Sequence, residues 1–231
     1  MTDKKIKNSG KRFLTVKVKT ARGRSKSSAR WLHRQLNDPY VQRAQAEHYR
    51  SRAAYKLLEI NEKYHLIKPE MTVVDLGAAP GGWTQVLIQL MQPEKHPKSQ
   101  IIALDIVAID ELPGVHFIQD DFTQETALEA LYGAAPDEVD VVLTDMAPSS
   151  TGHRQTDHLR IMALVELAYD FAIKALKPGG SFVAKVLQGG TEPQLLMQMK
   201  KSFEKVAHFK PPASRKDSSE MYLIARGFRH I

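Results

Sequence analysis

The stretch VVDLGAAPGGWT, residues 73–84, decides the fold class of this chain. Two β-branched residues lead into an acid, and three glycines (Gly77, Gly81 and Gly82) follow within a few positions. An apolar strand that runs into a glycine-rich loop and then a helix is typical of nucleotide-binding α/β folds. The spacing is neither G-x-G-x-x-G nor G-x-x-x-x-G-K-[ST], and the loop has no lysine for a phosphate. The loop therefore allows close backbone approach to a ligand but is poorly suited to gripping a phosphate.

Expected strands and helices alternate on both sides of this stretch. Strands are predicted at 72–76, 100–106, 115–119, 139–145, 181–187, near 205–210 and near 221–226, and helices at 82–91, 123–132, 157–176 and 192–203. A helical stretch at 38–64, begun by Asp38 and Pro39 and broken near Ser51, comes before them. This alternation predicts an α/β fold with a seven-stranded, mostly parallel sheet and helices on both faces. We expect one such domain at 31–231, with its sheet core at 71–228.

The composition excludes several classes of protein. The 231 residues include no cysteine, which excludes disulfides, a thiolate nucleophile and cysteine metal sites. No apolar run is long enough to span a membrane, and the charged N-terminus does not have the pattern of a secretory signal. We therefore expect a soluble, cytoplasmic protein.

The positive charge is concentrated in the first quarter of the chain. Residues 1–52 contain 15 Lys and Arg against three acids, whereas the remaining residues contain 18 against 23. A basic arm on an acidic body indicates a polyanionic partner such as RNA. A solvated tail is the plain alternative, and an organelle transit peptide is disfavoured because TVKVKT alternates like a strand. We expect residues 1–30 to form a basic, flexible RNA-binding arm.

Acids follow the glycine loop at the ends of successive predicted strands. Asp105 lies near the end of the second strand, where it suits the two hydroxyls of a ribose. Asp121 follows the third strand and can accept a hydrogen bond from an exocyclic amine. A site for ribose and adenine without phosphate describes S-adenosylmethionine. The alternative is that Asp75, Asp105 and Asp121 only cap helices or turns.

Two lysines and two carboxylates form a second set of candidates. Asp145 ends an apolar strand, and Lys185 lies within another, where an unpaired ammonium would be costly. Lys56 lies on the helix before the first strand, and Glu220 lies just before the last one. Taken singly, Lys185 could extend to solvent, Glu220 could be an exposed turn acid and Lys56 a helix-surface charge. Together with the glycine loop, the four residues indicate a catalytic site.

The motifs resemble those of one enzyme family. RSRAAYKLLEI, VVDLGAAPGGWT, LTDMAPSSTG, KPGGSFVAKVLQG and PPASRKDSSEMYLIA are similar to the FtsJ/RrmJ (RlmE) family of ribosomal RNA 2′-O-ribose methyltransferases, over about residues 30–228. The resemblance implies a Rossmann-like class I methyltransferase fold that uses S-adenosylmethionine. It places a Lys-Asp-Lys-Glu catalytic set on Lys56, Asp145, Lys185 and Glu220, and cofactor contacts on Gly81, Trp83, Asp105, Asp121 and Asp145. It also implies a uridine of 23S ribosomal RNA, in the large ribosomal subunit, as the target.

The expected reaction is the in-line attack of a ribose 2′-oxygen on the methyl group of a sulfonium. Lys185 is the candidate proton acceptor; if it stays charged, it would instead orient the hydroxyl and stabilise the developing oxyanion. The alternatives are a 2′-O-methyltransferase of another RNA (tRNA or cap), a non-catalytic RNA-binding or ribosome-assembly factor, and a nicotinamide-dependent oxidoreductase. The missing G-x-G-x-x-G argues against the last. We expect no metal, because the nine histidines are scattered. We also expect a monomer.

Overall fold

The computed structural model describes residues 26–135, 138–148, 151–188 and 193–229 of the chain. The chain divides into two compact units, Met1–His48 and Tyr49–Ile231. The predicted arm at 1–30 therefore lies largely outside the described residues. Within the described ranges, no helix combines the length and the apolar character needed to cross a membrane.

The first unit contains two short helices, α1 (Lys26–Leu36) and α2 (Pro39–Ala46). The side chain of Asp38 caps α2 by accepting a hydrogen bond of 3.0 Å from the backbone N–H of Tyr40, as the sequence predicts. Helix α1 was not predicted. Its serine-rich, cationic start has the composition of a flexible segment, so that composition alone does not indicate a helix.

The second unit is built on a seven-stranded sheet, as predicted, in the order β3-β2-β1-β4-β5-β7-β6. The strands are β1 (Thr72–Leu76), β2 (Gln100–Asp105), β3 (Val115–Gln119), β4 (Val139–Thr144), β5 (Leu176–Leu187), β6 (Phe203–Phe209) and β7 (Glu220–Phe228). Strands β1 to β5 pair in parallel, and β7 inserts antiparallel between β5 and β6. The strand order reverses between β1 and β4, which is where ligands bind in open α/β sheets.

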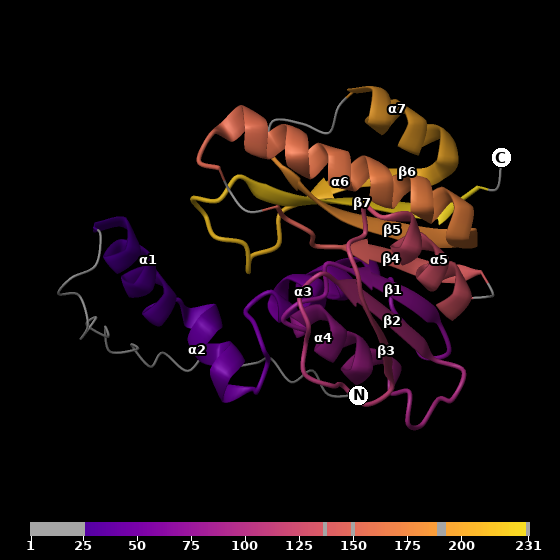
Figure 1. Cartoon of the computed structure of the whole chain (residues 1–231), viewed down its shortest axis with the longest axis horizontal. Helices are drawn as coiled ribbons and strands as arrows, with labels where there is room; N and C mark the ends of the chain where they lie inside the picture. Colours follow the sequence, from indigo (N-terminus) through magenta and orange to yellow (C-terminus); the bar gives the residue numbers. More distant parts are fainter. Residues whose placement is uncertain (1–25, 136–137, 149–150, 189–192, 230–231) are drawn as a thin grey trace, which may run out of the picture. The chain divides into compact units, whose positions relative to one another are not determined.

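Helices cover both faces of this sheet (Figure 1). Helices α3 (Ala54–Tyr64) and α4 (Gly82–Met91) pack on one face. Helices α5 (Glu125–Ala134), α6 (Arg154–Ala175) and α7 (Pro193–Ser202) pack on the other. The turn at 47–53 separates α2 from α3 and coincides with the break predicted near Ser51.

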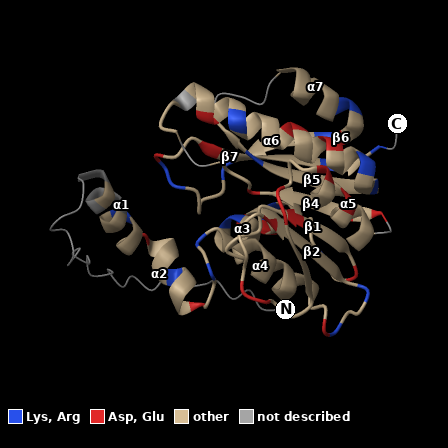
Figure 2. Ribbon diagram, viewed as in Figure 1, with Lys and Arg blue, Asp and Glu red and all other residues tan. Residues whose placement is uncertain are grey.

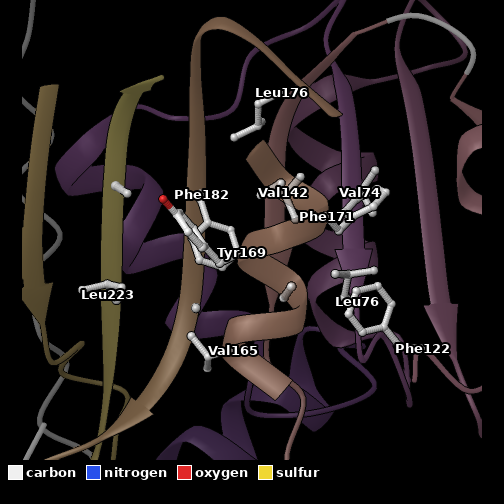
Figure 3. Close-up of a cluster of buried hydrophobic side chains, with 14 of the residues drawn as sticks. Val74, Leu76, Phe122, Val142, Val165, Tyr169, Phe171, Leu176, Phe182 and Leu223 are labelled. Atoms are coloured by element: carbon white, nitrogen blue, oxygen red, sulfur yellow. The ribbon is translucent and has the colours of Figure 1, made fainter. Parts of the chain in front are cut away.

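One hydrophobic core cluster lies between the sheet and α6, where Figure 3 shows Val165, Tyr169 and Phe171 of the helix against the strands. A second cluster lies under α3 and α4 on the other face. Phe182 and Val142 are fully buried in the first cluster. Side chains of this size contribute about 1.5–3 kcal/mol each when they are removed from water. In Figure 2 the strands are mostly tan, and most charged residues lie on helices and loops. The inner strands β1, β2, β4, β5 and β7 are mostly buried on both faces, whereas the edge strands β3 and β6 are partly exposed.

Strand β5 begins earlier than the sequence indicates. Its expected start was residue 181, but Leu176 already pairs with Val139, and regular pairing resumes at Val141 and Ser181 after a bulge. Helix α6 ends at Ala175, close to the predicted end at 176, but the segment KPGG, which was expected to separate the helix from the strand, lies within β5. An ion pair of 2.5 Å between Lys177 and Asp140 joins the bulge to β4.

Candidate active site

A cluster of two ammonium groups and two carboxylates lies at the carboxyl ends of the central strands. The Nζ atom of Lys185 lies 3.1 Å from Oδ1 of Asp145 and also donates to the Asp145 backbone carbonyl. The Nζ atom of Lys56 lies 2.8 Å from the Glu220 carboxylate and 3.9 Å from Oδ2 of Asp145. The four residues named from the sequence are therefore brought together, with Asp145 between the two lysines.

The pairing of β7 with β5 creates this cluster. Leu187 pairs with Glu220 and Lys185 with Tyr222, so the antiparallel strand brings its acid to the end of β5. Lys56 reaches the same point from the first turns of α3. Only 8% of Lys185 is exposed, which excludes the alternative that its side chain extends into solvent. The charges are paired, as burial requires.

Tyr222 is a further member of the cluster, which the sequence analysis missed. Its hydroxyl donates a hydrogen bond of 2.7 Å to Oδ1 of Asp145, and its ring packs 5.6 Å from that of Trp83. Burial, followed by the nearby carboxylates of Asp145 and Glu220, raises the pKa of Tyr222 well above its usual value, so the hydroxyl stays protonated. Tyr222 follows Glu220 by two residues on a strand, and this period of two could have placed it on the same face.

Asp145 is held in its ionised form. Burial alone would raise the pKa of its carboxyl, but the ammonium groups of Lys185 and Lys56 and the Tyr222 hydroxyl hold that pKa below its ordinary value. The centre of the cluster is therefore a permanent carboxylate at neutral pH, bonded by two cations and a phenol.

A cavity of about 700 Å³ opens beside the cluster. Its wall includes the glycine loop, the ends of β2 and β3, and one face of α6, with Asp145 at the border. Apolar lining comes from Leu104, Ile106, Met146 and Leu164. A volume of this size suits a ligand as large as a nucleoside with a substituent.

Asp105 and Asp121 line this cavity and also organise its loops. Asp105 accepts backbone N–H bonds of 2.8 Å from Ala79 and 2.8 Å from Val107. Oδ1 of Asp121 accepts bonds from the backbone N–H and the hydroxyl of Thr123, which lower the pKa of Asp121. Asp105 and Asp121 therefore do cap turns, which the sequence analysis gave as the alternative role. These bonds leave carboxylate lone pairs for a ligand, because each oxygen can accept two bonds.

The glycine loop is shaped by close backbone contacts. Gly77 has a φ of 81°, and a Cβ atom there would lie 2.6 Å from the Met146 side chain and 2.9 Å from its backbone. Gly81 has a φ of 103°. Both positions require glycine, because a residue with a side chain would be strained there.

Comparison with protein families identifies the architecture. Residues 49–228 match the model of the FtsJ-like methyltransferase family. The chain belongs to the FtsJ-like methyltransferase family. The match spans most of the second compact unit and includes all four residues of the cluster.

Named relatives agree with this assignment. The chain is 54% identical to the ribosomal RNA large subunit methyltransferase E of Azorhizobium caulinodans, over 94% of this chain and 90% of that protein. It is 54% identical to the protein of the same name from Paramagnetospirillum magneticum, over 95% and 91%. A solved structure described as a ribosomal RNA methyltransferase of Plasmodium falciparum superposes with a TM-score of 0.69 at 29% identity, covering 78% of this chain and 98% of that one.

Two of the residues that the FtsJ-like resemblance assigned to the cofactor do not line the cavity. Trp83 is 3% exposed, and its indole N–H donates to the Ala53 carbonyl, at 2.8 Å. Its side chain therefore packs between α3 and Tyr222, and only its backbone N–H, in the first turn of α4, remains for a ligand. Gly81 lies under the side chain of Arg50.

Asp75 is a buried carboxyl that the sequence grouped with the strand-end acids Asp105 and Asp121, with a capping role as the alternative. It lies on β1 and is fully buried, and one oxygen accepts a 2.8 Å bond from the Thr84 hydroxyl. Within the described residues its other oxygen, Oδ1, has no partner. Burial, reduced by the Thr84 bond and assisted by the charges of Asp145 and Asp105, raises the pKa of Asp75 to about 7.

The part of the chain that the structure describes contains no set of side chains arranged to bind a metal ion. No group of three or more histidines and acids is placed there to hold an ion. The carboxylates of the cluster are instead engaged by lysines.

Proposed function

We propose that this methyltransferase transfers the methyl group of S-adenosylmethionine to the ribose 2′-oxygen of a uridine in 23S ribosomal RNA. The family and the names of the relatives support the reaction class and the acceptor. With ribosomal RNA as the acceptor, the reaction takes place in the cytoplasm. The roles of individual residues are argued below from their geometry.

The observation that carries the proposal is the position of Asp145. This carboxylate borders the cavity and is also the shared partner of Lys56 and Lys185. A ligand in the cavity and a nucleotide at the two lysines would therefore meet at one residue. A transfer between two bound molecules requires such a meeting point.

The residues around the cavity fit S-adenosylmethionine. Asp105 can accept the two ribose hydroxyls, and Asp121 can accept the adenine amine through Oδ2. Ile106 and Met146 provide apolar surface for a purine. The glycine loop itself contains no lysine of the kind that a P-loop places on a phosphate. The bound cofactor would supply an activated methyl group on sulfur.

The cluster would position the ribose and take its proton. In this proposal the Lys185 ammonium first gives up a proton to solvent, and its free Nζ lone pair then accepts the proton of the 2′-hydroxyl. Asp145 and the Asp145 carbonyl fix the direction of that nitrogen. The Lys56–Glu220 pair lies at the other side of Asp145, where it can hold the nucleotide.

The first experiment compares the wild-type protein with Lys185→Ala. The substrates are labelled S-adenosylmethionine and large ribosomal subunits from cells that lack this methylation, and the modified sugar is then mapped. Loss of a positioned proton acceptor should slow single-turnover transfer by about 10²–10⁴-fold. Binding of S-adenosylhomocysteine should remain near normal, because Lys185 does not line the cavity.

The matched control is Lys174→Ala, which removes an exposed lysine from the last turn of α6. It should transfer at the wild-type rate. If Lys185→Ala also keeps a near-normal rate, Lys185 is not the proton acceptor. If the wild-type protein labels no ribose, the proposed reaction is wrong.

A further inference from the structure

The turn between α2 and α3 contains two arginines that have no part in the mechanism above. Arg50 and Arg52 lie two residues apart in the second compact unit, just before α3. Their side chains bond to different loops of the active site.

Arg50 joins the two loops that border the cavity. Its Nη1 atom donates to the carbonyls of Asp110, at 2.9 Å, and Pro80, at 3.4 Å. Its Nη2 atom donates to the carbonyl of Glu111, at 3.3 Å. The guanidinium therefore links the glycine loop to the loop between β2 and β3, and its own backbone N–H is fixed by Gln85 of α4, at 2.7 Å.

The same two loops are also joined by Asp105, through Ala79 and Val107. Asp105 lines the cavity, whereas Arg50 does not. A Cβ atom on Gly81 would lie 2.8 Å from Nη1 of Arg50, so the arginine packs directly on the glycine loop. Arg50 thus sets the spacing of the cavity walls without facing a ligand.

Arg52 bonds to the loop at 210–219, between β6 and β7. It donates to the carbonyl of Ala213, while the Ala213 N–H donates to Glu59 of α3, at 2.7 Å. The next residue, Ser214, donates to Oε1 of Glu220, at 2.9 Å. Arg52 therefore supports the loop that orients Glu220, and through it Lys56. Figure 2 shows both blue and red ribbon on this loop.

We propose that Arg50 and Arg52 are positioning residues for opposite sides of the reaction, Arg50 for the cofactor and Arg52 for the RNA. This inference rests on the proposed function. The two arginines bond to different loops, so their effects should separate. Each guanidinium bonds to neutral carbonyls, and a charge-assisted bond of this kind is worth about a tenfold change in an equilibrium constant.

The experiment measures cofactor binding and the kinetics with RNA separately for each variant. Arg50→Ala should raise the Kd for S-adenosylhomocysteine and the KM for S-adenosylmethionine about tenfold, while kcat and the KM for RNA stay within about twofold. Arg52→Ala should leave the Kd for S-adenosylhomocysteine within about twofold and should lower kcat/KM for RNA about tenfold. Calorimetry with S-adenosylhomocysteine needs no RNA, so the cofactor side is measured even if no transfer is detected.

Three further variants test the mechanism. Arg50→Lys should not rescue cofactor affinity, because one ammonium cannot span carbonyls on two loops. Glu59→Ala removes the other bond to Ala213 and should reproduce the Arg52→Ala effect. Lys174→Ala should change neither side, and thermal unfolding checks that each variant is folded. The proposal is overturned if either arginine variant affects cofactor and RNA equally, or affects neither.

Discussion

Asp75 lies on β1 and Asp145 directly follows the neighbouring strand β4, and the pKa values of these two carboxyl groups are shifted in opposite directions. Both are buried, but Asp145 has two ammonium groups beside it, whereas Asp75 has one hydroxyl. Burial penalises the charged form of each, and only Asp145 has cations to offset that penalty. Local partners therefore decide that one acid is ionised and that the other can hold a proton.

Asp75→Asn tests this difference through the pH dependence of stability. The folded chain keeps the Asp75 proton up to about pH 7, whereas the unfolded chain loses it near pH 4, so the wild type loses stability as pH rises between these values. Asparagine carries no such penalty and can still accept the Thr84 bond. The free energy of unfolding of the variant, measured relative to that of the wild type, should therefore rise by up to about 4 kcal/mol between pH 4 and 7. A difference between the two proteins that is the same at every pH does not count toward this rise. Urea unfolding at several pH values measures this, and parallel curves for the two proteins would refute the prediction.

At the scale of elements, the glycine loop depends on contacts that a single methyl group would disturb. Gly77→Ala places a Cβ atom against the backbone of Met146 at a positive φ, so the loop or β4 must shift. We expect cofactor affinity to fall at least about tenfold, together with a lower free energy of unfolding. Calorimetry with S-adenosylhomocysteine and urea unfolding provide the two measurements.

Gly133→Ala is the matched control for that prediction. Gly133 lies within α5, and a Cβ atom there would contact nothing within 4 Å. The substitution should stabilise the protein by about 0.5–1 kcal/mol and leave cofactor affinity unchanged. If both alanine variants bind the cofactor equally well, the glycine loop is not constrained as described.

The sequence predicted the elements better than the contacts between them. All seven strands were expected because apolar runs between turn residues report burial directly. The order of the strands in the sheet was not predicted. The insertion of β7 between β5 and β6 brings Tyr222 to Asp145. Likewise, Arg50 and Arg52 were counted only as positive charge, because the sequence around them does not indicate which backbone carbonyls their side chains bond. Local pattern specifies an element, whereas partners that are distant in sequence depend on topology.

At the scale of the whole molecule, charge is divided between a basic first quarter and an acidic remainder. The cavity and the cluster use acids and paired lysines, and so add little net attraction for RNA. We propose that the basic arm provides this attraction through the phosphate backbone. Such binding releases counterions and weakens as salt concentration rises.

Deletion of residues 1–25 tests the arm and leaves every described residue in place. The segment contains nine Lys and Arg and one acid. RNA affinity should fall, and the slope of log K against log salt should become shallower by about 0.7 for each phosphate of single-stranded RNA that the arm neutralises in the wild type. A variant with the order of residues 1–25 scrambled should keep the wild-type slope, because the effect depends on charge and not on order. If the deletion leaves the slope unchanged, residues 1–25 do not contact phosphates, and RNA must be attracted by the rest of the chain.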